Sequence, residues 1–251
     1  AMIVQNMFSQ ILDKRFKTLF NSNKEKETEF HRFSIIKEFL NKKNFNGFTS
    51  NDLFIMQFIK KGWGHDIAAL SNMAEALVSL SIKNPTNLQY KYLMKEVVQR
   101  AVHPKVNPYK KKIDSIKYLG KYGYYLEHLN IILGCYLRIV DDRYIRLNTK
   151  VSHHLLSCSM AKKDYHADLL PYVKMKWSAD QAAIIYSLWL FDQNNKTDLS
   201  FDLKKHWLSY MKRNCVHSKT GLFQTEVLGV KKYSKEPRGC SLSYLIHYMG
   251  R

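Results

Sequence analysis

The sequence lacks the short motifs that mark most cofactor-dependent enzymes. It contains no phosphate-binding glycine loop, no Gly-x-Ser-x-Gly motif and no dinucleotide-binding fingerprint. Its four cysteines lie far apart without a Cys-x-x-Cys pair, so no particular disulfide pairing is indicated. No His-x-x-x-His sequence stands near a carboxylate, which disfavours a zinc site. We therefore expect neither a metal nor a cofactor.

Long apolar runs are also absent. The longest, such as residues 182–191, are about half the length that a membrane-spanning helix needs, so no transmembrane segment is expected. No signal peptide is recognisable, which leaves the cytoplasm open, or the periplasm or exterior if a leader has been removed. Residues 2–20 form one apolar helical stripe with basic residues elsewhere. This stretch is interpreted either as a terminal helix docked on the protein, the favoured reading, or as a peripheral contact with a membrane surface.

Positive charge is what the chain has in excess. Its 251 residues include 40 Lys and Arg against 21 Asp and Glu, a net charge of +19. Such an excess favours anionic partners, among them an anionic polymer such as an acidic polysaccharide. The basic residues are spread along the chain, however, and no zinc-finger, RNA-binding or helix-turn-helix motif accompanies them. Nucleic acid and anionic lipid are thus candidates by charge alone, with no nucleic-acid motif, and a generally lysine-rich composition is the favoured explanation of the charge.

One arrangement recurs four times at nearly even spacing: a small or polar stretch with an ionisable residue, then an apolar helical run. The stretches are residues 62–66, 124–128, 177–180 and 237–239. Their ionisable residues, separated by 62, 52 and 58 positions, are Asp66, His128, Asp180 and Arg238. This spacing has room for two helices and two turns and predicts a helical array. If the array closes, the polar helix starts meet on one rim, as the residues of an active site do.

The apolar periodicity predicts two kinds of helix. Helices buried on most sides are expected over residues 66–80, 126–140, 181–193 and 240–249. Helices with one apolar face are expected over residues 87–102, 143–161 and 201–214, the last capped by Ser200 or Thr197. Residues 30–40 and 50–60 are predicted as further helices, and 223–230 as a short extended segment. No strand ladder is recognised.

This alternation predicts an all-α fold, namely an α/α-toroid of about five helical hairpins. The toroid is expected over residues 29–251, after an amphipathic helix and loop over residues 1–28. A closed barrel needs roughly six hairpins, so the ring is either open or completed by a partner chain. The sequence does not fix the oligomeric state.

Three carboxylates at these helix starts are candidates for acid–base catalysis. Asp180 precedes a run with almost no polar side chain, so it is either a helix cap or a general acid or base whose pKa burial raises. Glu127 begins the second inner helix, and Asp66 holds the equivalent place in the first. Two carboxylates on facing helix starts would suit glycoside cleavage, in which about 5–10 Å separates them.

The remaining candidates would bind or orient the substrate. His128 either shuttles a proton or is a hydrogen-bonded core histidine. Arg238 either clamps a carboxylate or phosphate, neutralising charge that develops in the reaction, or forms a structural ion pair with Asp180 or Glu127. The predicted substrate-binding residues are Trp63, His65, Tyr124, Tyr125, Trp177 and Arg238.

Two stretches resemble the linalool dehydratase/isomerase-like domain. Residues 124–131 (YYLEHLNI), then 134–136 (GCY) and 141–144 (DDRY), are similar to a Tyr-x-Gly-His-Leu-Asn-Met type segment that ends in a Gly-Asp-x-x-Tyr turn. Residues 178–181 (SADQ) through 187–192 (SLWLFD) are similar to that family's Glu-Pro-Asp-Asn segment and the helix after it.

The resemblance spans roughly residues 60–250 and implies an α/α-barrel whose pocket performs acid–base chemistry without a cofactor. It implies that His128 corresponds to the family's histidine and Asp180 to its aspartate. The family's cysteines that flank the aspartate are absent, and Trp177 and apolar residues stand there instead. Terpene-alcohol dehydration is therefore not implied, and we expect an anionic or hydroxylated substrate, such as a glycan.

The sequence thus predicts a cofactor-independent hydrolase, lyase or isomerase acting on a small molecule or glycan. Asp180 would form the acid/base pair with Glu127 or Asp66, while His128 and Tyr124 orient the substrate. A non-catalytic module that holds an anionic polymer or a protein partner in a basic concavity is the alternative. A membrane-surface protein docked by its N-terminal stretch is a third, weaker interpretation.

Overall fold

The computed structural model describes residues 65–250 except 172, 230, 231, 234 and 235, together with residues 30–40 except 32 and 39. The chain forms two compact units, residues 1–43 and 44–251, whereas the sequence places the boundary after residue 28. The described residues between 30 and 40 are helical, as predicted. The expected helices over residues 2–20 and 50–60 lie outside the described residues.

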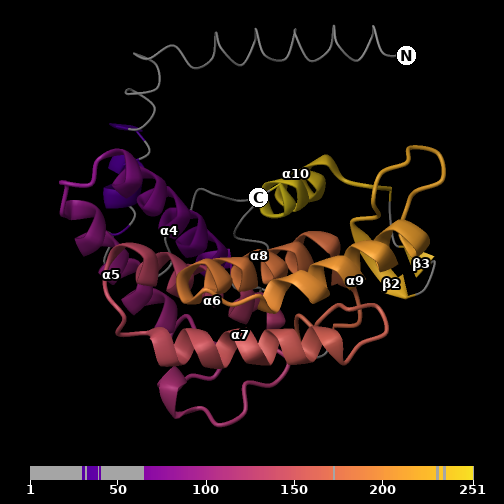
Figure 1. The fold of residues 1–251 in the computed structure, drawn as a ribbon, viewed down its shortest axis with the longest axis horizontal. Helices are drawn as coiled ribbons and strands as arrows, with labels where there is room; N and C mark the ends of the chain where they lie inside the picture. Colours follow the sequence, from indigo (N-terminus) through magenta and orange to yellow (C-terminus); the bar gives the residue numbers. More distant parts are fainter. Residues whose placement is uncertain are drawn as a thin grey trace, which may run out of the picture. The chain divides into compact units, whose positions relative to one another are not determined.

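The second unit is built mainly from helices (Figure 1). In chain order they are α4 (His65–Lys83), α5 (Gln89–Val102), α6 (Gly123–Ile139), α7 (Ile145–Met160), α8 (Ser178–Asn195), α9 (Leu199–Asn214) and α10 (Gly239–Met249), with a short 3₁₀ helix, η1 (Ile113–Ser115), between α5 and α6. Every predicted helix in this range is confirmed, and no end differs from the prediction by more than three residues. The described part of the chain is therefore predominantly helical, as expected. None of its helices is both long and apolar enough to span a membrane.

The helices alternate between a central and a covering position. Helix α6 packs against α4 and α8, and residues 125–136 of α6 are all buried. Helices α5, α7 and α9 cover this layer and bury one face each. On α5 the buried residues recur at three- and four-residue intervals: Tyr90, Leu93, Met94, Val97, Val98 and Ala101. An apolar helix buried all round and a one-sided helix outside it are what the two sequence patterns predict.

Helix α10 is more exposed than predicted. It was expected to be buried on most sides, but only Leu245 and Tyr248 are buried, while Ile246 is 68% exposed. The helix packs against α8, and His247 Nε2 lies 3.3 Å from a carboxylate oxygen of Glu75 on α4. Helix α10 therefore contacts both of these helices through one face and leaves the other uncovered by the described residues.

A small antiparallel sheet connects the starts of α8 and α10. Its strands are β1 (Lys176–Trp177), β2 (Glu226–Gly229) and β3 (Lys232–Tyr233), in the order β1-β2-β3. Strand β2 lies within the predicted extended segment, but the expectation that no strand ladder forms is wrong. Two-residue strands are too short to produce an alternating pattern that could be recognised in the sequence. Because β1 directly precedes α8, its pairing with β2 fixes the position where that helix begins.

The start of α9 is capped from the preceding helix. The predicted caps, Ser200 and Thr197, do not fill this role with their side chains. Instead the Asp192 carboxylate accepts hydrogen bonds from the Leu199 and Ser200 N–H groups, at 2.8 and 2.9 Å, and from the Thr197 hydroxyl at 2.7 Å. First-turn N–H groups have no partner within their own helix, so Asp192 satisfies donors that would otherwise be unpaired.

Replacing Asp192 by Ala is expected to lower the free energy of unfolding by about 1–2 kcal/mol, the usual cost of losing a helix-capping side chain. Asp198→Ala is the matched control, because Asp198 occupies the N-cap position of α9 without a side-chain capping bond. Its effect should stay within about 0.5 kcal/mol. Urea denaturation of both variants measures the difference, and equal losses would contradict the assignment of the cap to Asp192.

Candidate functional site

The central helices enclose a cavity of about 240 Å³ close to their N-terminal ends. Its lining comes from α4, α6, α8 and α10: Ala68, Asn72, Tyr124, Glu127, His128, Trp177, Ala179, Asp180, Ala183, Cys240, Ser241, Tyr244 and Tyr248. The structure therefore brings the predicted stretches 124–128 and 177–180 together with the helix that follows 237–239. The predicted meeting of all four stretches is thus seen for two of them, since residues 237–239 are not part of the lining and the side chains of 62–66 lie outside the described part of the structure.

The Glu127 carboxylate is the most enclosed polar group of the cavity. Its side chain has no exposed surface, and neither oxygen has a hydrogen-bond partner among the described residues. The His128 Nε2 atom lies 3.6 Å from Glu127 Oε1. Burial, and secondly the charge of Asp180, raises the pKa of Glu127 well above its usual range. The environment of Glu127 therefore favours its protonated form.

Asp180 does not act as the cap of its helix. The N-cap of α8 is Trp177, and no side chain makes a capping hydrogen bond there. Asp180 lies in the first turn, half-buried, and lines the cavity. Burial raises the pKa of Asp180 to about 7. The pair therefore combines a carboxyl that holds its proton with one that gains and loses a proton near neutral pH, an arrangement suited to acid–base catalysis.

Hydrogen bonding on α4 fixes the orientation of His128. The Ser71 hydroxyl donates to the Ala68 carbonyl at 3.0 Å and lies 2.8 Å from His128 Nδ1. Because that hydroxyl has a single proton, it accepts a hydrogen bond from Nδ1–H of His128. The other ring nitrogen, Nε2, then faces Glu127. The ring of Tyr124 meets His128 edge-on, with centroids 5.0 Å apart.

A backbone contact holds the start of α6, which carries these side chains. The N–H groups of Gly123 and Tyr124 donate to the carbonyls of Asp168 and Leu169, each at 3.1 Å. These are first-turn N–H groups without partners inside the helix. A Cβ atom at Gly123 would lie 2.6 Å from the Asp168 carbonyl oxygen, so only glycine allows this approach.

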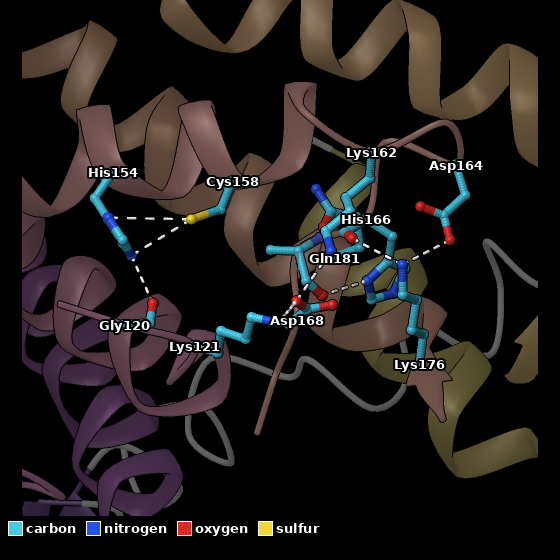
Figure 2. Close-up of polar contacts among 11 residues, drawn as sticks. Gly120, Lys121, His154, Cys158, Lys162, Asp164, His166, Asp168, Lys176 and Gln181 are labelled. Carbon is cyan, nitrogen blue, oxygen red and sulfur yellow. Dashed lines mark hydrogen bonds and ion pairs between the residues drawn. The ribbon is translucent and has the colours of Figure 1, made fainter. Parts of the chain in front are cut away.

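Side chains hold the loop that makes this contact (Figure 2). The Asp168 carboxylate pairs with Lys162 at 3.0 Å and with Lys121 at 3.3 Å. Gln181, one residue after Asp180, accepts a hydrogen bond from the Ala167 N–H at 3.0 Å. His166 Nε2 lies 3.0 Å from the Trp177 carbonyl oxygen, and burial lowers the pKa of His166 to about 4. The loop is therefore tied to the starts of both α6 and α8.

Replacing Gly123 by Ala is expected to lower the free energy of unfolding by about 1–3 kcal/mol, because a backbone atom has to move to make room. Hydrogen exchange at the Tyr124 amide should become faster, since its bond to Leu169 weakens. Gly239→Ala is the control: its Cβ would have no neighbour within 4 Å. Thermal unfolding and hydrogen exchange measure both variants, and similar behaviour of the two would refute the close-approach role of Gly123.

Other predicted site residues lie elsewhere. Arg238 forms an ion pair with the buried Glu226 on β2, so the expected pairing with Asp180 or Glu127 is not the one that forms. This ion pair fixes the start of α10. The hydroxyl of Tyr125 donates to the Ala101 carbonyl at 2.9 Å, within the core rather than in the cavity.

The first of the four predicted stretches is not seen at the site. Trp63 lies outside the described residues. His65 and Asp66 begin α4, but their side chains are likewise outside the described part of the structure.

The sequence analysis missed residues of α10 that line the cavity. Cys240, Ser241, Tyr244 and Tyr248 all belong to this helix. The four-residue spacing of Tyr244 and Tyr248 places both on one helix face, a signal that could have been used. All four cysteines of the chain are free thiols, and Cys240 is the one at the cavity.

A second, smaller cavity of about 150 Å³ adjoins the first. The two cavities share Tyr124, Trp177 and Asp180, and the second adds Leu169 and Leu170. Asp180 therefore lines both cavities, at the boundary between the larger one, which has several polar side chains, and the smaller one, which is mainly apolar.

Comparisons with known proteins give no relative: no protein-family model matches the chain, and no curated protein matches it. Among the described residues, no group of three His, Cys, Asp or Glu side chains is placed to hold a metal ion. The case for function therefore rests on the cavity and its side chains.

Proposed function

We propose that this chain is a cofactor-independent acid/base enzyme acting on a small hydroxylated molecule, with glycans as the first class to test. The observation that carries the proposal is that Glu127 and Asp180 share one cavity, where burial raises both pKa values. A carboxyl kept protonated beside one that titrates near 7 supplies an acid and a base together.

The proposed reaction moves two protons. Protonated Glu127 gives its proton to a leaving or carbonyl oxygen of the substrate, while ionised Asp180 takes a proton from water or from a C–H or O–H group of the substrate. Exchange with solvent then restores both carboxyls. His128, held by its contact with Ser71, lies beside Glu127; after it takes a proton from solvent, its ring N–H returns that proton to the Glu127 carboxylate. Hydrolase, lyase and isomerase reactions all fit this scheme.

The lining favours a substrate without negative charge. Among the described lining residues there are two carboxyls and neither lysine nor arginine. An anionic substrate would add to the repulsion between Glu127 and Asp180. We therefore propose the hydroxylated rather than the anionic class, and the basic concavity expected for an anionic polymer finds no support in this cavity.

We also propose that the hairpins belong to an α/α-toroid of the linalool dehydratase/isomerase-like kind. Support comes from the alternation of central and covering helices and from the cavity that the central helices α4, α6 and α8 line together with α10. His128 and Asp180, which the resemblance matches to family residues, both lie there. The acid/base proposal rests on the cavity itself and stands without this relationship.

The test is a screen of neutral glycosides, polyols and hydroxy compounds for turnover by the purified chain. Any activity found must be lost in both Glu127→Gln and Asp180→Asn. Turnover that survives both substitutions would place the chemistry elsewhere and refute the proposal.

A further inference from the structure

We propose that the substrate of this site carries a positive charge: the cavity binds an organic cation, an ammonium or quaternary ammonium group on a hydroxylated body, between its aromatic walls and the carboxylates of Glu127 and Asp180. This inference rests on the proposed function, because it concerns the same site. The inference specifies that the substrate is positively charged, which the proposed acid/base chemistry by itself leaves open.

Aromatic rings form much of the cavity wall. Tyr124 comes from α6, Trp177 from the residue before α8, and Tyr244 and Tyr248 from α10. Tyr248 is buried, and Tyr244 stacks on it with ring centroids 6.2 Å apart. The faces of tyrosine and tryptophan rings attract cations, and groups of such rings recognise quaternary ammonium ligands.

Three buried polar atoms of residues that line the cavity are available to a ligand. Neither oxygen of Glu127 nor the hydroxyl of Tyr248 has a hydrogen-bond partner among the described residues, and both side chains are at least nine-tenths buried. Buried polar groups in proteins are normally paired, because their desolvation is otherwise uncompensated. An ammonium beside Glu127 would donate hydrogen bonds to its oxygens, a quaternary ammonium would balance their charge without a hydrogen bond, and a ligand hydroxyl near Tyr248 would pair with the phenol.

The charges around the carboxylates are unbalanced. The titratable groups that line the cavity with Glu127 come from three elements: Tyr124 and His128 of α6, Asp180 of α8, and Cys240, Tyr244 and Tyr248 of α10. Glu75 of α4 lies outside the lining, where it influences Tyr248 and pairs with His247. None of these is a lysine or arginine, although the chain as a whole carries a net charge of +19. The described part of the cavity is thus an acidic site within a basic protein.

A cation would resolve this imbalance, and a neutral ligand would not. Bound between Glu127 and Asp180, a positive charge favours the ionised form of Asp180, the carboxyl that titrates near 7, and lowers its pKa. Binding should therefore release protons near neutral pH. It should also tighten as the pH rises through about 7, where Asp180 loses its proton.

The experiment compares choline with 3,3-dimethylbutan-1-ol, a neutral molecule of nearly the same shape. Isothermal titration calorimetry is run on the full chain between pH 6 and 8 in buffers of different ionisation enthalpy, which reports the protons released. We expect choline to bind at least about tenfold more tightly than its neutral counterpart, with proton release. Equal binding of the two molecules, or no binding of choline at millimolar concentration, would overturn the inference.

Variants show whether binding takes place at this site. Glu127→Gln and Trp177→Leu should each weaken choline binding by about tenfold or more, while leaving thermal unfolding cooperative. Glu96→Gln makes the same chemical change on α5, outside the cavity lining, and should leave binding unchanged. If all three variants bind choline like the original chain, the cation lies elsewhere and the inference is wrong.

The two proposals can fail separately. Carboxyl pKa values measured by ¹³C NMR test the acid/base pair without any ligand. If the Asp180 carboxyl titrates near 7 but the protein does not prefer choline to the neutral alcohol, only the inferred positive charge of the substrate is contradicted. If both carboxyls have ordinary pKa values, the proposed acid/base function is contradicted, whether or not choline binds.

Discussion

Substituting Glu127 by Gln or Asp180 by Asn is expected to lower kcat/KM by about 10²–10⁴-fold on any substrate that the wild-type chain converts. Each amide keeps the size of the side chain and cannot exchange a proton. Both groups serve the same catalytic step, so the double variant should lose much less than the product of the two single losses. Steady-state kinetics across pH 5–9 measures these effects.

The pH profile tells the two roles apart. In the wild type, kcat/KM should rise as Asp180 ionises near pH 7 and fall again when Glu127 loses its proton at higher pH. Asp180→Asn should remove the rising limb from whatever activity is left. Glu96→Gln, on the covering helix α5, is the matched control and should leave both limbs in place. Equal profiles for all variants would show that neither carboxyl takes part.

The Asp180→Asn variant should be more stable than the wild type above pH 7, by up to about 4 kcal/mol. Burial raises the pKa of Asp180 to about 7 in the folded chain, against about 4 in the unfolded chain. Between these values the unfolded state loses a proton that the folded state keeps. The free energy of unfolding therefore falls with rising pH in the wild type, and the Asn variant lacks this part of the fall.

Denaturant unfolding at pH 4 and at pH 8 measures this prediction. The two proteins should differ little at pH 4, where Asp180 is protonated in the folded chain and still about half protonated in the unfolded chain, and should differ most at pH 8. The Asp180→Asn variant should therefore gain stability and lose activity together, as is common when a functional side chain destabilises the folded protein. A constant difference at both pH values would mean that packing, and not proton binding, separates the two proteins.

The central helices could be predicted because their signals are local. Residues 131–137 of α6 (IILGCYL) have no charged or amide side chain, and a helix without a polar face has to be buried. Glu127 and Asp180 could be predicted to meet because regular spacing places equivalent helix starts on one side of an array. Both inferences use order along the chain, which the sequence contains directly.

Contacts made across space could not be predicted in the same way. Arg238 was expected to pair with Asp180 or Glu127, yet it pairs with Glu226, because a three-stranded sheet brings Glu226 to the start of α10. The cap of α9 likewise comes from Asp192 in the preceding helix rather than from the Ser or Thr beside the helix start. In both cases several partners are chemically suitable, and only the folded arrangement selects one.

The sequence by itself determined the helical class, the helix boundaries to within three residues and the main acid/base candidates, since periodicity and residue chemistry are properties of the chain alone. The tertiary structure decided which of those candidates share a cavity, that tyrosines of α10 line it, and that its described lining lacks a basic residue. It also decided the proton affinities of Glu127 and Asp180. A carboxyl's pKa depends on how much water and which charges surround it, and those surroundings exist only once the helices have packed.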